Sequence, residues 1–106
     1  MHAARLLNVI SNPLTNEKIP LHIECKNQAE LSLVTWWKQT LEGCPASKFP
    51  VLIYRLNYQP KPTVYMALND FFSWLSDQKI TAFDTHISIE FDEFMDLVKN
   101  KYVSKI

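Results

Sequence analysis

Apolar and polar residues alternate in the stretch IPLHIECK, residues 19–26, which is typical of a β-strand with one buried face. Side chains two positions apart share a face of a strand, so His22, Glu24 and Lys26 should line one face and the apolar residues the other. An apolar segment over 5–11 comes earlier, and turn-forming residues separate the two segments. The pattern predicts a hairpin that pairs strand 5–11 with strand 19–26.

The following segment, SLVTWWKQTLEG, carries apolar residues at three- and four-residue spacing, which predicts a helix over residues 33–42. Ser32 stands where it could cap the first turn of this helix. Gly43 stands where helices often end in a left-handed conformation. Of the two adjacent tryptophans, we expect one in the core and the other at a partly exposed contact.

The run FPVLIYRLN, residues 49–57, is almost continuously apolar, which is typical of a central strand. A turn at YQPKP and a second strand, TVYMAL at 63–68, follow it, so we expect an antiparallel hairpin. Asn69 or Asp70 should then cap a short helix with the sequence DFFSWLSDQ.

The last part of the chain predicts an extended segment over 82–91 and an amphipathic helix over 92–103. The complete order is β-β-α-β-β-α-β-α. This order indicates an α/β (α+β) fold in which helices flank a central mixed β-sheet.

Length and composition narrow the function classes. The chain has 106 residues, so we expect 1–106 to form one domain, and 47% of its residues are hydrophobic, which suffices for a core. Eleven basic and 11 acidic residues give a net charge of zero, which argues against a generally basic DNA binder and confines any nucleic-acid contact to a local patch. Cys25 and Cys44 form no zinc pattern, and Cys25 is expected to be a core thiol. A lone histidine such as His22 is usually structural.

Four motifs occur in a characteristic order: E-C-K at 24–26, W-W-K-Q at 36–39, P-V-L-I-Y-R at 50–55 and L-N-D-F-F at 68–72. In this order they resemble the phage-type branch of the PD-(D/E)XK nucleases, near the archaeal Holliday-junction resolvases. The resemblance covers roughly residues 8–75, and it implies a restriction-endonuclease-like core.

The resemblance also implies a chemistry, the hydrolysis of DNA phosphodiester bonds with Mg²⁺ or Mn²⁺. It makes Glu24 a metal ligand and the backbone carbonyl of Cys25 a second ligand. Lys26 would be the catalytic lysine that orients the attacking water, and Gln39 would support the site. Contacts with nucleic acid are implied for Arg55, Lys38 and Trp36.

The chain departs from the family pattern at one position. The family has an Asp on the strand before E-x-K, whereas this chain has no Asp before Asp70. Asn8 falls near the missing Asp, and a neutral amide beside a single carboxylate should hold Mg²⁺ weakly. Three explanations stay open: a relative that binds without cutting, an acid supplied by Asp70 or by a dimer partner, or a resemblance of fold alone.

Two functions follow as hypotheses. The first is a DNA-binding nuclease that acts on branched DNA, working as a homodimer because a four-way junction has two-fold symmetry. The second is a non-enzymatic, phage-encoded inhibitor that reuses the fold to bind a host protein or nucleoprotein complex. No apolar run approaches the roughly 20 residues that span a bilayer, so we expect a protein of the cytoplasm, that of the host cell if a phage encodes it, without membrane contact.

Overall fold

The computed structural model of the chain describes residues 19–103, and in this part four strands form one sheet in the order β1-β2-β3-β4. The strands are β1 (Leu21–Gln28), β2 (Phe49–Leu56), β3 (Thr63–Ala67) and β4 (His86–Glu90). β1 and β2 run parallel, whereas β2–β3 and β3–β4 are antiparallel pairs. The sheet is therefore mixed, as the sequence predicts.

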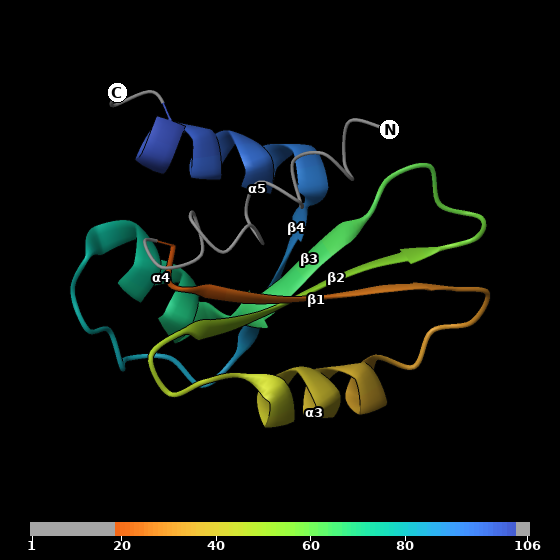
Figure 1. Ribbon diagram of the computed structural model, residues 1–106, viewed down its shortest axis with the longest axis horizontal. Coiled ribbons are helices and arrows are strands. Elements are labelled where there is room, and N and C mark those ends of the chain that lie inside the picture. The colour runs from red at the N-terminus through yellow and green to blue at the C-terminus, as the bar shows by residue number, and fades with distance from the viewer. Residues whose placement is uncertain (1–18, 104–106) are drawn as a thin grey trace.

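Helices lie on both faces of this sheet (Figure 1). α3 (Leu33–Gly43) connects β1 to β2 across one face. α5 (Phe91–Val98) covers the other face and continues into a π-helical turn, η1 (Lys99–Val103). α4 (Leu68–Ser76) lies beside the end of the sheet where β1 and β2 begin. This α+β architecture is compatible with a restriction-endonuclease-like core.

The order of elements from residue 19 onward is β-α-β-β-α-β-α, which agrees with the predicted order from its second strand. The predicted first strand, 5–11, lies outside the described residues. β2 lies between β1 and β3, which confirms the prediction of a central strand from its continuous apolar run. Between residues 19 and 103, no helix combines the length and the apolar character that crossing a membrane requires.

Two apolar clusters hold the sheet between its helices. Val51 and Ile53 of β2 belong to the larger cluster, which includes residues of α4 and α5. Leu52 and Leu56 belong to the smaller cluster, where they pack with Trp36 of α3. This alternation follows from the two-residue period of a strand. Burying each such aliphatic side chain contributes about 1.5–3 kcal/mol to folding.

The predicted cap of α4 is wrong, because the helix begins at Leu68 and its N-cap is Ala67. Asn69 instead fixes the loop that connects α4 to β4. Its Nδ2 donates a hydrogen bond to the carbonyl of Phe83 at 2.7 Å, and its Oδ1 accepts one from the Phe83 amide at 2.8 Å. The amide side chain therefore serves the loop and not the helix terminus.

The predicted left-handed conformation of Gly43 is also wrong, since no glycine of the described residues has a positive φ. Gly43 instead lies where the end of α3 approaches β1: a Cβ there would lie 3.4 Å from His22 Nε2 and 3.5 Å from Glu24 Oε1. Such distances leave room for a methyl group, but a longer side chain would collide with this pair. The positive φ occurs at Asp77, which ends α4 with φ of 57°.

Cys25 is exposed, which corrects the prediction of a core thiol. The side chain does belong to the face of β1 opposite Glu24, as the alternation requires. The apolar cluster ends before it, however, because Ile23 is only partly buried at the margin of that cluster. Partial shielding from water, together with the charge of Glu24, raises the pKa of the Cys25 thiol.

We predict that Gly43→Ala stabilises the protein by about 0.5–1 kcal/mol, because glycine in a helix loses more conformational entropy on folding than alanine. The new methyl group would make only ordinary van der Waals contacts. Urea unfolding of the two proteins measures the difference. A loss of stability in the variant would mean that Gly43 does adopt a left-handed conformation.

Candidate active site at the edge of the sheet

Glu24 and Lys26 lie on the face of β1 that α3 covers. In the parallel pairing of β1 with β2, Glu24 is the partner of Leu52. Leu52 belongs to the apolar cluster of α3, and paired residues of neighbouring strands point to the same face. The structure thus brings the carboxylate and the ammonium of the E-x-K motif to one face, as the sequence predicts.

The Glu24 carboxylate lies at the C-terminal end of α3. Its Oε1 is 3.3 Å from His22 Nε2, and the position of a Cβ on Gly43 would be 3.5 Å away. The side chain is 39% exposed, so one side of the carboxylate faces protein and the other faces solvent. A carboxylate in this position can still reach a ligand from solution.

Lys26 is placed beside the aromatic contacts of α3. Its partner in the register is Tyr54, whose ring packs on Trp36 at a centroid distance of 5.8 Å. Lys26 is partly buried.

Gln39 lies one helical turn before Gly43, on the same side of α3. Because Gly43 contacts Glu24 and α3 runs antiparallel to β1, Gln39 is on the flank of the helix that faces the E-x-K strand. The side chain is exposed. The supporting role expected of Gln39 stays a prediction, and its position is consistent with that role.

The backbone carbonyl of Cys25 points away from β2. The carbonyls of Pro20 and Gln28 accept hydrogen bonds from Phe49 and Asn57, next to or in β2. Backbone groups of successive residues in a strand point to opposite sides, so even-numbered carbonyls of β1 face β2 and odd-numbered ones face the outer edge. The carbonyl expected to be a metal ligand is therefore directed to the outer edge of β1.

The residues predicted to contact nucleic acid are not gathered at this site. Arg55 pairs with Asn27, the residue that follows Lys26. Successive residues of a strand point to opposite faces, so the side chain of Arg55 is on the face of the sheet opposite to that of Lys26. Trp36 is 6% exposed and packs in the core, so it has no open ring face for stacking on a base. Lys38 is exposed on α3. The burial of Trp36 beside a half-buried Trp37 confirms the expected division between the two tryptophans.

The donor set that the resemblance implies for a divalent cation is small. Glu24 offers one carboxylate, and Cys25 offers a carbonyl at the outer edge of the strand. In the described part of the chain, no group of three or more His, Cys, Asp or Glu side chains is arranged to hold a metal ion. Asn8, aligned with the family's Asp, lies outside the described residues. Mg²⁺ is commonly held by one or two carboxylates, with waters and substrate phosphates completing its coordination.

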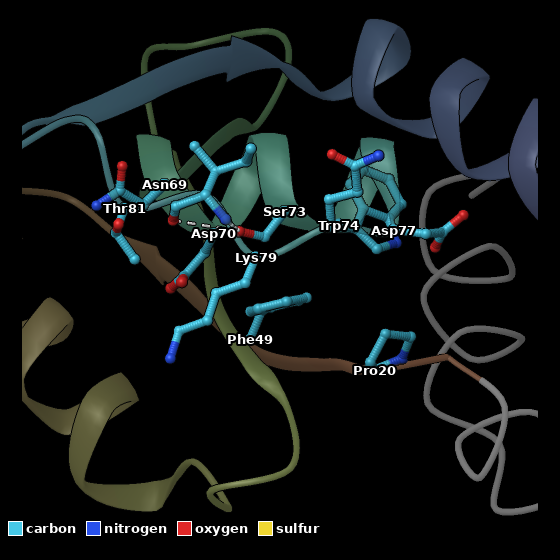
Figure 2. A pocket seen from close by; sticks show the side chains of 11 residues that line it. Pro20, Phe49, Asn69, Asp70, Ser73, Trp74, Asp77, Lys79 and Thr81 are labelled. Atoms are coloured by element: carbon cyan, nitrogen blue, oxygen red, sulfur yellow. Dashed lines mark hydrogen bonds between the residues drawn. The ribbon is translucent and has the colours of Figure 1, made fainter.

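Asp70, the other acid considered for the site, lies in a pocket of about 560 Å³ between α4 and the start of β2. Figure 2 shows Asp70 and Lys79 projecting from the α4 side into this pocket, near Phe49. Burial and, next to it, the charge of Asp70 raise the pKa of the thiol of Cys44, which directly follows Gly43. Glu24 and Asp70 are thus both close to the end of α3.

His22 lies beside Glu24, where sequence analysis gave it no role. The alternation placed it on the Glu24 face, but a lone histidine was expected to be structural. Its imidazole is in fact the closest charged or polar partner that the structure gives to Glu24. The signal that was available is the spacing of two residues in a strand, which makes such side chains neighbours.

Burial raises the pKa of the Asp70 carboxyl above its ordinary value, and the nearby His86 partly offsets this effect. The charged Asp70 carboxylate therefore lowers the stability of the folded protein at any pH above the pKa of an aspartate in the unfolded chain, about 4. We predict that Asp70→Asn is more stable than the wild type at neutral pH, and that the gain disappears as the pH falls below about 4.

Urea unfolding across this pH range measures the effect, with Asp84→Asn as the control because Asp84 is exposed. A gain that is equal at low and neutral pH would show that it does not arise from the charge of Asp70.

Comparison with known proteins supplies the family. No curated protein and no solved structure matches the chain. The sequence pattern of one family, described as phage putative PDDEXK endonuclease, matches residues 4–104, almost the whole chain. The matched range includes the strand with Glu24 and Lys26, the helix with Gln39, and Asp70. The chain belongs to the phage putative PDDEXK endonuclease family.

Proposed function

We propose that this protein is a Mg²⁺- or Mn²⁺-dependent endonuclease that hydrolyses phosphodiester bonds of DNA. The observation that carries the proposal is the common face of Glu24 and Lys26 under α3, in a chain of a nuclease family. A carboxylate and an ammonium side by side supply what this hydrolysis requires, a metal ligand and a cation close to the phosphate.

Each residue has a distinct role in this proposal. The Glu24 carboxylate and the Cys25 carbonyl would hold the cation, and a bound cation would supply Lewis-acid activation of the phosphate and of the attacking water. The Lys26 ammonium orients the attacking water and offsets phosphate charge. The Gln39 amide, one turn from Gly43, supports the attacking water by hydrogen bonding.

The substrate we propose is branched DNA, on the basis of the resemblance to Holliday-junction resolvases. The zero net charge of the chain provides little long-range attraction, so recognition must depend on local contacts. The exposed Lys38 and the partly buried Arg55 are candidate contacts with the DNA backbone, Arg55 from the opposite face of the sheet. A homodimer would present two such sites to the two-fold symmetry of a four-way junction.

The second candidate is a non-enzymatic protein that binds a host protein or nucleoprotein complex. One observation favours it: the described residues provide a single carboxylate beside Lys26 and no cluster of three metal ligands. In this case the nuclease fold would be retained as a scaffold, because fold alone does not determine function.

We predict that the wild type nicks branched DNA when Mg²⁺ or Mn²⁺ is present, and that Glu24→Gln and Lys26→Met each lower the rate about 10²–10³-fold. Both substitutions keep the approximate size of the side chain while removing its charge. Glu30→Gln is the matched control, because Glu30 is an exposed glutamate outside the site. Gel assays with four-way and linear DNA measure the rates.

Failure of the wild type to cut either DNA with either metal, combined with no retention of DNA at low salt, would reject the nuclease and favour the protein-binding candidate. Cleavage that persists unchanged in Glu24→Gln would place the catalytic residues elsewhere.

We further predict that Asn8→Asp tightens Mg²⁺ binding, because it restores the second carboxylate that the family pattern contains. Isothermal titration of the wild type and the variant with Mg²⁺ measures the change. Asn12→Asp serves as a control that adds the same charge four residues away. Equal effects of the two substitutions would mean that position 8 does not take part in the metal site.

A further inference from the structure

The imidazole of His22 presents a nitrogen that has no hydrogen-bond partner. Among the buried side-chain nitrogen and oxygen atoms of residues 19–103, Nε2 of His22 is the atom left without one. It lies 3.3 Å from Oε1 of Glu24. The two atoms come from side chains that the strand places on the same face.

This arrangement calls for a proton or a metal ion between the two atoms. If Nε2 is unprotonated, its lone pair faces a carboxylate oxygen, and two acceptors in contact repel each other. Either a proton on Nε2 or a cation bound by both atoms removes the repulsion. Two neighbouring ligands of an octahedral ion with bonds of about 2.1 Å are about 3 Å apart, which is close to the observed separation.

We propose that His22 Nε2 and the Glu24 carboxylate together bind a divalent transition metal, so that this site prefers Mn²⁺ to Mg²⁺. Imidazole nitrogen is a good ligand for first-row transition metals, whereas Mg²⁺ takes oxygen ligands. The proposal deepens the proposed function, on which it rests for the role of Glu24 in metal binding.

The end of α3 brings backbone, and no side chain, next to the pair. Gly43 has no side chain, and the position where its Cβ would be is 3.4 Å from Nε2 and 3.5 Å from Oε1. His22 Nε2 is itself buried, whereas the Glu24 side chain is 39% exposed, so solvent reaches the pair from the carboxylate. Waters and a phosphate oxygen of DNA can therefore complete the coordination that two protein ligands leave incomplete.

The other histidine of the described residues is in a different setting. His86 stacks on Tyr65 with a centroid distance of 5.0 Å and meets the edge of Trp37 at 5.3 Å. His86 belongs to β4, at the other edge of the sheet from β1, and these two aromatic contacts hold its ring there. His86 is therefore a suitable control for the effect of removing an imidazole.

The test measures Mn²⁺ and Mg²⁺ binding to the full chain without DNA, using electron paramagnetic resonance of free Mn²⁺ and isothermal titration. We expect His22→Phe, which keeps the ring shape without a donor, to weaken Mn²⁺ binding at least tenfold and to change Mg²⁺ binding much less. Glu24→Gln should weaken both, and His86→Gln should weaken neither. Electron spin echo spectra of the Mn²⁺-bound wild type should show coupling to a ¹⁴N nucleus, and this coupling should be lost in His22→Phe.

Thermal unfolding verifies that His22→Phe is folded, and if it is not, His22→Gln is used in its place. The ¹⁴N coupling of the wild type tests the proposal independently of either variant. Unchanged Mn²⁺ affinity in a folded variant, or no nitrogen coupling in the wild type, would overturn the proposal. DNA cleavage that depends on Glu24 but not on His22 would sink this inference alone. Mn²⁺ bound through His22 without any DNA cleavage would support it and count against the proposed function.

Discussion

The parallel pairing of β1 with β2 is the constraint on which the candidate site depends. Two parallel neighbours cannot be joined by a tight turn, so the chain must cross one face of the sheet, and α3 makes this crossing. The crossing places the end of α3 against the first half of β1, where Gly43 contacts His22 and Glu24. One strand pairing thereby determines which face carries the E-x-K motif and what covers it.

The features that depend on short-range periodicity could be predicted from the sequence. The two-residue alternation gave the common face of Glu24 and Lys26, and the continuous apolar run gave the central position of β2. The three- and four-residue spacing gave α3 within one residue of its observed bounds. Such hydrophobic patterns show which side of a strand or helix is buried, so they predicted the elements that have one buried face.

The features that depend on particular tertiary neighbours could not be predicted in the same way. Gly43 was expected to serve a helix terminus, but its role comes from the distance between α3 and β1. Asn69 was expected to cap α4, but a loop fourteen residues later satisfies its amide. Cys25 is exposed because the apolar cluster stops at Ile23. In each case the local sequence was compatible with two roles for the residue, and tertiary packing determined which role it has.

The outward direction of the Cys25 carbonyl has a consequence for how sheets can grow at β1. Any strand that adds to this edge, from this chain or another, would seek the same carbonyl as a partner in its ladder. An oxygen engaged in that ladder has less capacity for a cation. Extension of the sheet and the metal binding that we propose therefore compete for the carbonyl of residue 25, and both can occur only if the added strand diverges before it reaches that residue.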